Sequence, residues 1–308
     1  MKILRHGLAA PPQTAIAIGS FDGVHRGHAA LLERIRDAAR ERGLASAVVT
    51  FEPLPREYFT PAAAPARISS LAERLAQIAR CGIEIAFVER FDARFAALTA
   101  AQFEERLRLR YGARWILVGE DFRYGARRAG DAAGLQAAGQ RLGFEVEVAK
   151  NVEAGGGRIS STRVREALAA ADFATAAELL GRPYAICGRV VHGARRGRGL
   201  GFPTANVRLA RPKAALHGIF AVKCFGAATR GLEGVASLGI NPAVNDGGPA
   251  TLEAFLFDFS GDLYGRRLTI EFRKKLREES HFPSLDALAA QIRRDCDAAR
   301  EHFSRLEL

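Results

Sequence analysis

Residues 19–28 read GSFDGVHRGH, and this stretch decides the fold of the first half of the chain. An apolar run at 14–18 precedes it and predicts a strand, while residues 27–42 carry apolar side chains at helical spacing. Glycines at such a junction allow the backbone to approach a phosphate, and the start of the helix offers free N–H groups. The stretch therefore predicts an α/β sheet with a phosphate-binding loop at the carboxyl end of a strand.

Two histidines in this stretch, His25 and His28, flank Gly27 and can donate hydrogen bonds to phosphate oxygens on one side of the loop. Such donors suit displacement at an α-phosphorus with pyrophosphate as the leaving group, because they stabilise the charge of the transition state. Solvent-exposed turn histidines are the alternative interpretation, and the whole glycine and histidine pattern disfavours it. No Gly-Lys-Ser/Thr follows, so the loop is not a Walker A loop. We predict that His25 and His28 are catalytic and that the nucleotide contacts Gly19, Phe21, Asp22 and Gly27.

Strand-like and helical patterns alternate from residue 15 to about residue 150. Strands are predicted at 14–18, 46–51, 83–88, 115–118 and 144–148. Capping boxes at Ser70 with Glu73 and at Thr99 with Gln102 predict two of the helix starts. On the first helix, the predicted apolar stripe consists of Ala30, Leu31, Arg34, Ile35 and Ala38. This alternation predicts an open, Rossmann-like parallel sheet with helices on both faces.

A second phosphate-binding element is predicted at residues 159–165, which read ISSTRVR. Hydroxyl groups and backbone N–H groups at a helix start, together with two arginines, can hold a triphosphate. Taken alone, Ser-Ser-Thr would be an ordinary helix N-cap. Because the histidine motif lies in the same half, we predict that Ser161, Thr162 and Arg163 bind the nucleotide.

The second half of the chain has a different pattern, with short strand-like runs separated by glycine-rich turns. These runs lie at 184–191, 218–225, 234–239, 251–257 and 267–272. They predict an antiparallel β-barrel, followed by a helix capped by Ser284 with Leu285, Leu288 and Ile292 on one face. We place the boundary between the two domains at 182/183, which gives domains 1–182 and 183–308.

Residues 192–206 read HGARRGRGLGFPTAN and form the densest motif of the second half. A basic, glycine-rich run is typical of a phosphate loop, so we predict nucleotide binding at Gly193, Gly201 and Pro203. Thr204 and Asn206 are two residues apart and share a face of an extended segment. Their oxygen atoms are of the kind that contact Mg²⁺. A surface turn is the alternative, and the Phe-Pro-Thr-Ala-Asn end of the motif disfavours it.

Composition narrows the class of protein. The longest apolar runs are a few residues and no signal peptide is visible, so we expect a cytoplasmic protein without a membrane partner. Four widely spaced cysteines indicate neither a zinc site nor a disulfide framework. The net charge of +11 raises the possibility of a nucleic-acid partner. We expect none, because the arginines are scattered among acidic residues and suit a protein that handles polyphosphates. No pattern indicates an oligomeric state.

Several motifs together resemble the bacterial bifunctional riboflavin kinase/FAD synthetase family, in the order of that family, over about residues 12–302. The segments that resemble its adenylyltransferase module are 19–28, 50–57, 118–125 and 160–165. Those that resemble its kinase module are 192–206, 251–259, 261–265 and 275–279 with Phe282. The resemblance implies that the second half phosphorylates riboflavin to FMN and that the first half transfers AMP to FMN, giving FAD and pyrophosphate. ATP and Mg²⁺ would serve both steps, with riboflavin, FMN and FAD as substrates and products.

The resemblance also implies roles for single residues. Glu253 would be the general base that takes the proton of the ribityl 5′-hydroxyl, and Thr204 and Asn206 would be the Mg²⁺ ligands. Asp121 would lie near the nucleotide of the first half. Flavin contacts would come from Phe51, Pro53, Pro55 and Arg277.

The chain departs from the family pattern at a few positions. Ser20 stands where the family usually has Asn, and Leu54 where it has a second His. Asn241 and Ala243 replace an Arg and a Thr, which bears on flavin-side contacts of the kinase half. Two other functions stay open from the residues alone: a nucleotidyltransferase for another acceptor with an accessory second domain, and a basic RNA-binding protein. The Phe-Pro-Thr-Ala-Asn string argues against the first, and the aromatic content of 8% argues against the second.

Overall fold

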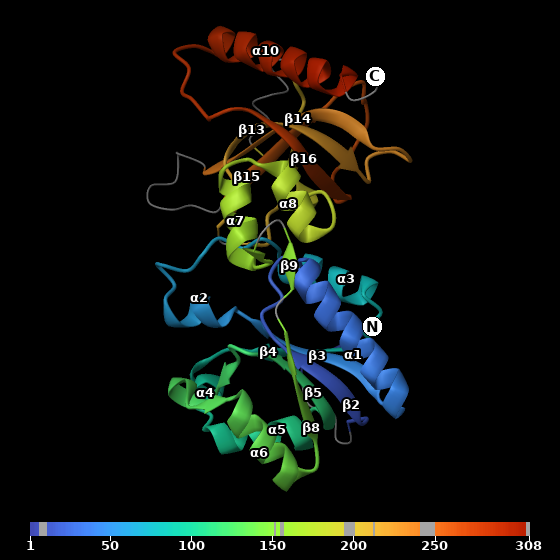
Figure 1. Cartoon of the computed structure of the whole chain (residues 1–308). Coiled ribbons are helices and arrows are strands. Elements are labelled where there is room, and N and C mark those ends of the chain that lie inside the picture. The colour runs from blue at the N-terminus through green and yellow to red at the C-terminus, as the bar shows by residue number, and fades with distance from the viewer. Residues whose placement is uncertain are drawn as a thin grey trace. The chain divides into compact units, whose positions relative to one another are not determined.

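A computed structural model of the chain describes residues 1–5, 11–150, 152–154, 157–193, 201–211, 213–240 and 250–305 (Figure 1). The chain forms two compact units. The first comprises Met1–Pro65 and Leu71–Ser160, and the second comprises Ala66–Ser70 and Ser161–Leu308.

The first unit is built on a parallel sheet of six strands in the order β1-β4-β3-β2-β5-β8. Every neighbouring pair in this sheet is parallel, as the alternating sequence pattern predicts. The strands are β1 (Lys2–Leu4), β2 (Thr14–Ile18), β3 (Ala45–Glu52), β4 (Ile85–Arg90), β5 (Ala113–Gly119) and β8 (Glu145–Ala149). The prediction of an open parallel sheet is thereby confirmed.

Helices cover both faces of this sheet (Figure 1). On one face, α1 (Arg26–Arg42) and α3 (Leu71–Arg80) pack on Ala15 and Ala17 of β2, and on the other, α5 (Ala100–Leu109) and α6 (Ala132–Leu142) pack on Ile16. The chain therefore changes face between β4 and β5. The central strand β2 pairs with β3 on one side and β5 on the other, so the carboxyl end of β2 lies at the topological switch point, where open α/β sheets bind ligands.

Two details of this unit differ from the sequence prediction. The buried stripe of α1 consists of Leu32, Ile35, Ala38 and Ala39. Arg34, which was predicted to belong to this stripe, does not. Its guanidinium lies 5.1 Å from the ring centre of Trp115, because the large indole offers a stacking surface at the sheet. The same guanidinium also forms an ion pair with Glu147.

Several short elements of the first unit were not predicted, because two to five residues are too few to show the period of a helix or a strand. These are α2 (Pro55–Phe59), α4 (Ala93–Ala96), β6 (Arg123–Tyr124), η1 (Ala126–Arg128), β7 (Gly130–Asp131), β9 (Glu153–Ala154) and β10 (Gly157–Arg158). The capping box of Thr99 with Gln102 is confirmed, with both of its hydrogen bonds present.

The second unit begins with α7 (Ser161–Ala169) and α8 (Phe173–Leu180) and continues into a closed barrel of six antiparallel strands. Around the barrel the order is β11-β12-β15-β14-β13-β16. The strands are β11 (Ala185–Val191), β12 (Ala205–Val207), β13 (Gly218–Phe225), β14 (Leu232–Ile240), β15 (Ala250–Leu256) and β16 (Arg267–Arg277). The predicted antiparallel barrel is confirmed, with the three-residue β12 as an additional strand.

Helix α10 (Leu285–Ser304) packs on the outside of the barrel and is capped by the Ser284 hydroxyl, as predicted. Its contact stripe is Ala289, Ile292, Cys296, Ala299 and Phe303, at alternating spacings of three and four residues. The prediction that Leu285 joins this stripe is wrong, since that side chain is 65% exposed. Side chains lean toward the helix N-terminus, so that of the first residue extends past the end of the helix. Within the described ranges, no helix combines the length and the apolar character needed to cross a membrane.

Candidate active sites

Residues 19–28, here called the histidine loop, connect β2 to α1 through a sharply bent backbone. Gly23 has a φ of 83°, and Phe21 and Val24 have positive φ values of 49° and 43°. A positive φ is unfavourable for residues with bulky side chains, so surrounding structure must hold it. Here the side chains of Phe21 and Val24 are 2% and 3% exposed and belong to the core under α1. Core packing therefore fixes the path of the loop.

The bend makes His25 the N-cap of α1 and brings the two imidazoles together. The Nδ1 atom of His25 accepts a hydrogen bond from the backbone N–H of His28 at 3.3 Å. The two rings stack with their centres 3.7 Å apart, and Phe21 contacts His28 edge-on. An accepting Nδ1 carries no proton, so a proton on the imidazole of His25 lies on Nε2.

The imidazole of His28 is held neutral by its surroundings. Burial lowers its pKa well below the usual 6.5, and the charges of His25 and Arg74 lower it further. Its Nδ1 atom is buried and has no hydrogen-bond partner among the described residues. A buried polar atom without a partner costs free energy, which a bound phosphate oxygen can recover. The histidine loop therefore offers an anion site at the amino end of α1.

Gly27 is needed where the loop enters the helix. A Cβ atom at this position would lie 3.2 Å from Nδ1 of His25 and 3.5 Å from the carbonyl oxygen of Ile159. The same geometry shows that Ile159, the first residue of the second predicted phosphate element, lies beside the histidine loop. Ser161, Thr162 and Arg163 form the first turn of α7, which belongs to the second unit.

Asp121 follows β5 at the carboxyl edge of the same sheet. It is exposed and forms an ion pair of 2.6 Å with Arg158 on β10. The hydrogen bond from Arg158 holds the pKa of this carboxyl below its usual value. Asp121 therefore stays ionised and can accept hydrogen bonds from a ligand.

The predicted flavin residues of the first unit lie at the end of β3. Phe51 is 7% exposed and packs edge-on against Phe91 and Phe95, and Pro55 is the first residue of α2. Leu54, which stands where the resembling family has His, is buried. Pro53, which lies between Phe51 and Leu54 in the sequence, is half-buried.

Further aromatic rings extend this cluster to the surface. Phe59 is 63% exposed and Tyr58 is 37% exposed, and both contact Phe91. Sequence reasoning did not select these residues. The adjacent pair of large aromatics after a proline-containing turn was the signal that could have done so. Together they provide apolar ring surface next to the predicted flavin residues.

In the second unit, the residues predicted for kinase chemistry lie on neighbouring barrel strands. The hydroxyl of Thr204 donates a hydrogen bond of 3.1 Å to Oε2 of Glu253, although the two are 49 positions apart. Asn206 on β12 is directly opposite Glu253 on β15. Opposed residues in a ladder share a face, so the amide and the carboxylate are neighbours. The structure thus brings together three residues predicted from two separate motifs.

The Asn206 side chain covers the backbone of Gly193. A Cβ atom at position 193 would lie 2.3 Å from Cγ of Asn206, so only glycine fits with this rotamer. Gly201 has a φ of 83°, which also favours glycine, and Pro203 is exposed next to Thr204. The residues between Gly193 and Gly201, 194–200, lie outside the described part of the chain, as do Asn241 and Ala243.

One strand further along the barrel, Ser237 on β14 is also directly opposite Glu253. Its hydroxyl donates to Oε1 of Glu279 at 2.9 Å, and the Glu279 carboxylate lies over the backbone of Gly239. Asn206, Glu253 and Ser237 thus form a polar row across three strands, called here the Glu253 row. Sequence reasoning did not select Ser237 or Glu279, because their proximity depends on strand register.

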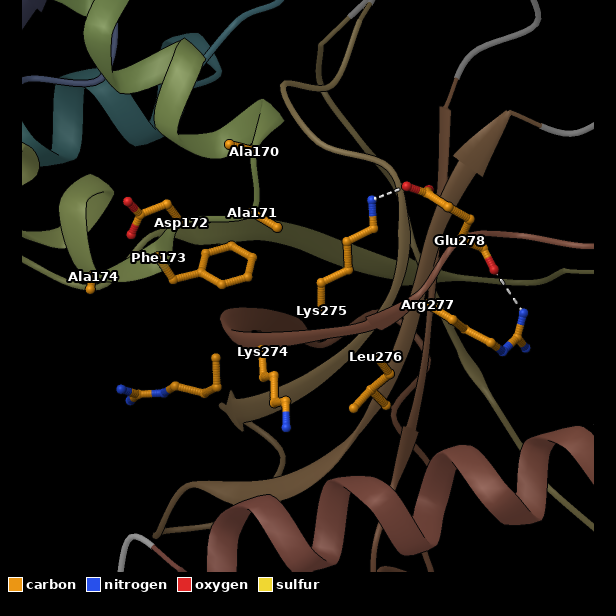
Figure 2. Close-up of a pocket in the computed structure, with 11 residues that line it drawn as sticks. Ala170, Ala171, Asp172, Phe173, Ala174, Lys274, Lys275, Leu276, Arg277 and Glu278 are labelled. Atoms are coloured by element: carbon orange, nitrogen blue, oxygen red, sulfur yellow. Dashed lines mark hydrogen bonds and ion pairs between the residues drawn. The ribbon is translucent and has the colours of Figure 1, made fainter.

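Arg277 lies at the end of β16, where Figure 2 shows it on one side of Glu278 and Lys275 on the other. Its guanidinium forms an ion pair of 2.8 Å with the buried Asp295 of α10. It also lies 5.5 Å from the ring centre of Phe282. Arg277 therefore ties the last barrel strand to α10, and its flavin contact stays a prediction.

The oxygen atoms of Thr204, Asn206 and Glu253 fit a magnesium ion. Hydroxyl, amide and carboxylate oxygens are ligands that hard divalent cations accept, and Mg²⁺ usually takes few protein ligands because it keeps waters and phosphate oxygens. In the part of the chain that the structure describes, no cluster of three or more His, Cys, Asp or Glu residues could hold a metal ion. Thr204 and Asn206, which lie next to the Glu253 carboxylate, have oxygen atoms that could hold Mg²⁺ together with a nucleotide.

Comparisons with known proteins match each half of the chain to a family. A family model described as FAD synthetase matches residues 8–163, and one described as riboflavin kinase matches residues 180–303. The Escherichia coli (strain K12) protein named bifunctional riboflavin kinase/FMN adenylyltransferase is 47% identical over 98% of both chains. Its Pseudomonas fluorescens namesake is 48% identical over 97% of both. A crystal structure described as a macrolide-efflux protein from Streptococcus pneumoniae has a TM-score of 0.79 and 31% identity, covering 97% of this chain and 98% of its own.

Proposed function

The chain belongs to the family of bifunctional riboflavin kinase/FMN adenylyltransferases, and we propose that the histidine loop and the Glu253 row are the centres of its two reactions. Its riboflavin kinase half phosphorylates riboflavin to FMN, and its FAD synthetase half adenylylates FMN to FAD. The observation that carries the proposal is the hydrogen bond between Thr204 and Glu253 beside Asn206, matched in the first unit by the stacked His25 and His28.

In the adenylyltransferase reaction, an oxygen of the FMN phosphate attacks the α-phosphorus of ATP, and the bond from that phosphorus to the leaving pyrophosphate breaks. The Nε2–H of His25 donates to a phosphate oxygen as charge develops, because its Nδ1 is already engaged by the backbone of His28. His28 is neutral in the free protein, and an approaching polyanion raises its affinity for a proton. No covalent intermediate is needed, since positioning and electrostatics carry the reaction.

The nucleotide contacts of this half extend beyond the histidines. Ser161, Thr162 and Arg163 hold the triphosphate through hydroxyl, backbone N–H and guanidinium donors at a helix start. The backbone at Gly19, Phe21, Asp22 and Gly27 and the carboxylate of Asp121 complete these contacts. Support for these roles comes from the family pattern and from the position of the loop at the switch point of the sheet.

FMN binds on the β3 side of the same sheet edge. Phe51, Pro53 and Pro55 shape this side, and the exposed ring of Phe59 offers a face on which an isoalloxazine can stack. Leu54 replaces a polar family residue by a buried apolar one, so it contributes packing and no hydrogen bond to the flavin.

In the kinase reaction, Glu253 takes the proton of the ribityl 5′-hydroxyl as that oxygen attacks the γ-phosphorus of ATP. The bond between the γ-phosphorus and the bridging oxygen breaks, and ADP leaves. The hydroxyl of Thr204 orients the Glu253 carboxylate through their hydrogen bond. Thr204 and Asn206 would hold Mg²⁺, which would neutralise charge on the phosphates. Gly193, Gly201 and Pro203 line the nucleotide, and Arg277 lies on the flavin side.

The functional domains follow the sequence division, with residues 1–182 serving FAD formation and residues 183–308 serving FMN formation. The family models match 8–163 and 180–303, which leaves residues 164–179, with most of α7 and of α8, between them. Both steps consume ATP, and this supports a cytoplasmic location and small-molecule substrates in place of a nucleic-acid partner.

A metal titration tests the kinase assignment. Asn206→Ala removes one proposed ligand, so we expect the Mg²⁺ concentration for half-maximal FMN formation to rise about tenfold or more. FAD formation from supplied FMN, measured on the same preparation, should keep the Mg²⁺ dependence of the unmodified enzyme. An unchanged Mg²⁺ curve for FMN formation would remove Asn206 from the site.

A further inference from the structure

A buried arginine that no motif singled out lies beneath the adenylyltransferase site. Arg74 is on α3, and its side chain is 1% exposed. Fully buried arginines are rare in proteins unless their guanidinium groups are paired. This one is turned toward the carboxyl ends of β2 and β3 and away from solvent.

The guanidinium of Arg74 connects two loops of different predicted function. One terminal nitrogen, Nη1, donates to the carbonyl oxygen of Ser20 at 2.8 Å. The other, Nη2, donates to the carbonyl oxygen of Phe51 at 2.9 Å and to the Glu52 carboxylate at 3.1 Å. Ser20 belongs to the histidine loop, while Phe51 and Glu52 end β3 and precede the predicted flavin residues Pro53 and Pro55.

Planar geometry suits arginine to this place. A guanidinium group presents several donors in a fixed fork, so one rigid group sets the spacing between two backbone carbonyls. The carbonyl of Ser20 directly precedes Phe21, whose φ of 49° begins the bend that positions His25. The carbonyl of Phe51 lies two residues before Pro53. A shift of the fork therefore moves the nucleotide side of the site relative to its flavin side.

Arg74 also acts on His28 through its charge. The charged and titratable groups that lower the pKa of His28 are His25, in the same loop, and Arg74, from the helix packed against it. A permanent positive charge at Arg74 disfavours a second positive charge on the imidazole. Position and charge are thus two separable contributions of one side chain.

We propose that Arg74 is a positioning residue for FMN adenylylation, and that its guanidinium fixes the histidine loop against the end of β3 so that the FMN phosphate and the α-phosphorus of ATP meet in line. A displacement of about 1 Å at a reacting centre lowers a rate about 100-fold. This inference rests on the assignment of the histidine loop to FAD formation, which His28→Ala tests separately in the same assay.

The experiment compares Arg74→Met, Arg74→Lys and Arg80→Met in the full-length chain. Arg80 is an exposed residue of the same helix and serves as the matched control. FAD formation from supplied FMN and FMN formation from riboflavin are measured on each preparation, so that the kinase half reports on intact protein. The emission of Trp115, the single tryptophan, checks the folding of the first unit.

We expect Arg74→Met to lower kcat for FAD formation about 100-fold while KM for FMN and ATP changes about threefold or less. Its acid limb in the pH profile of kcat/KM should move to higher pH, because the charge that lowers the pKa of His28 is gone. Arg74→Lys should lower kcat as well, since an ammonium group lacks the fork, but it should keep the acid limb of the unmodified enzyme. Arg80→Met should match the unmodified enzyme throughout.

Three results would overturn the proposal. The first is an Arg74→Met enzyme that forms FAD within about twofold of the unmodified rate. The second is an equal loss of FMN and FAD formation. The third is a pair of variants with identical pH profiles, which would make Arg74 a stability element only. If Arg74→Met does not fold, Arg74→Lys carries the test through its kcat and its KM values.

Discussion

The histidine loop is made by ten consecutive residues, whereas the Glu253 row is assembled from three separate strands between residues 205 and 256. In the loop, the backbone conformation positions the catalytic side chains. A glycine, two positive φ values in buried residues and an N-cap position turn two imidazoles to one side. In the row, the backbone is a regular ladder, and function depends on which side chains the register places opposite Glu253. One site is thus defined by local sequence and the other by strand pairing.

Because the two sites are built differently, substitutions should impair them in different ways. In the loop, substitutions act by shifting a ring through a tightly packed neighbour. In the row, they act by turning a side chain away from its place in the ladder. Glycines provide a matched pair for this comparison, because Gly193 underlies Asn206 and Gly27 underlies His25.

Gly193→Ala is expected to have the larger effect. The added Cβ would lie 2.3 Å from Cγ of Asn206, so the amide must leave its place opposite Glu253. We expect FMN formation to fall about 100-fold, as for a ligand moved by about 1 Å or more, with FAD formation from supplied FMN unchanged. Steady-state assays of both reactions check this. A kinase rate close to that of the unmodified enzyme would show that Asn206 is not needed in this rotamer.

Gly27→Ala is expected to have a smaller and more selective effect. The new methyl group would lie 3.2 Å from Nδ1 of His25, a distance that requires a shift of a few tenths of an ångström. We expect FAD formation to fall about tenfold. Stability should change by about 1 kcal/mol or less, because the gain in helix propensity from alanine opposes the tighter contact with His25. Urea unfolding followed by Trp115 emission, together with the FAD assay, tests this; a parallel loss of stability and activity would contradict it.

The sequence predicted the parts of the molecule that are local. The parallel sheet, the barrel, the Thr99 and Ser284 caps and the histidine loop all follow from short patterns of apolar period, turn and cap residues. The resemblance to a known family supplied Glu253, which no pattern in its own strand marks.

Features that depend on long-range contacts were not predictable. The Ser237–Glu279 pair joins residues 42 positions apart through the registers of β14 with β13 and of β13 with β16, because Ile219 pairs with both Ser237 and Arg277. Arg74 reaches carbonyl groups 54 and 23 positions away, and in the sequence it is one more arginine on an amphipathic helix. Backbone carbonyls leave no signature in a sequence, so a side chain that binds them cannot be recognised before the fold is known.

The smallest expected effect concerns the stability of the first unit in acid. The pKa of His28 is lowered in the folded protein, so below about pH 6.5 the unfolded state binds more protons than the folded state. The contribution of His28 to the free energy of unfolding is therefore present above that pH. It is lost as the pH falls, by about 1 kcal/mol over one pH unit. His28→Ala should remove this contribution to the change of the free energy of unfolding with pH. Urea unfolding at pH 7.5 and pH 5.5, read from Trp115 emission, measures it, and equal slopes would contradict the neutral imidazole.

The most direct test of two separate centres is a mixing experiment with His28→Ala and Glu253→Gln enzymes, each supplied with riboflavin, ATP and Mg²⁺. His28→Ala should accumulate FMN, because each lost donor at a charged transition state costs about 100- to 1,000-fold. Glu253→Gln should leave riboflavin unconverted, because general base catalysis supplies about 100- to 10,000-fold. The two variants mixed together should form FAD, since FMN from one is adenylylated by the other. A mixture that forms no FAD, although both variants are folded, would contradict the assignment of the two reactions to the histidine loop and the Glu253 row.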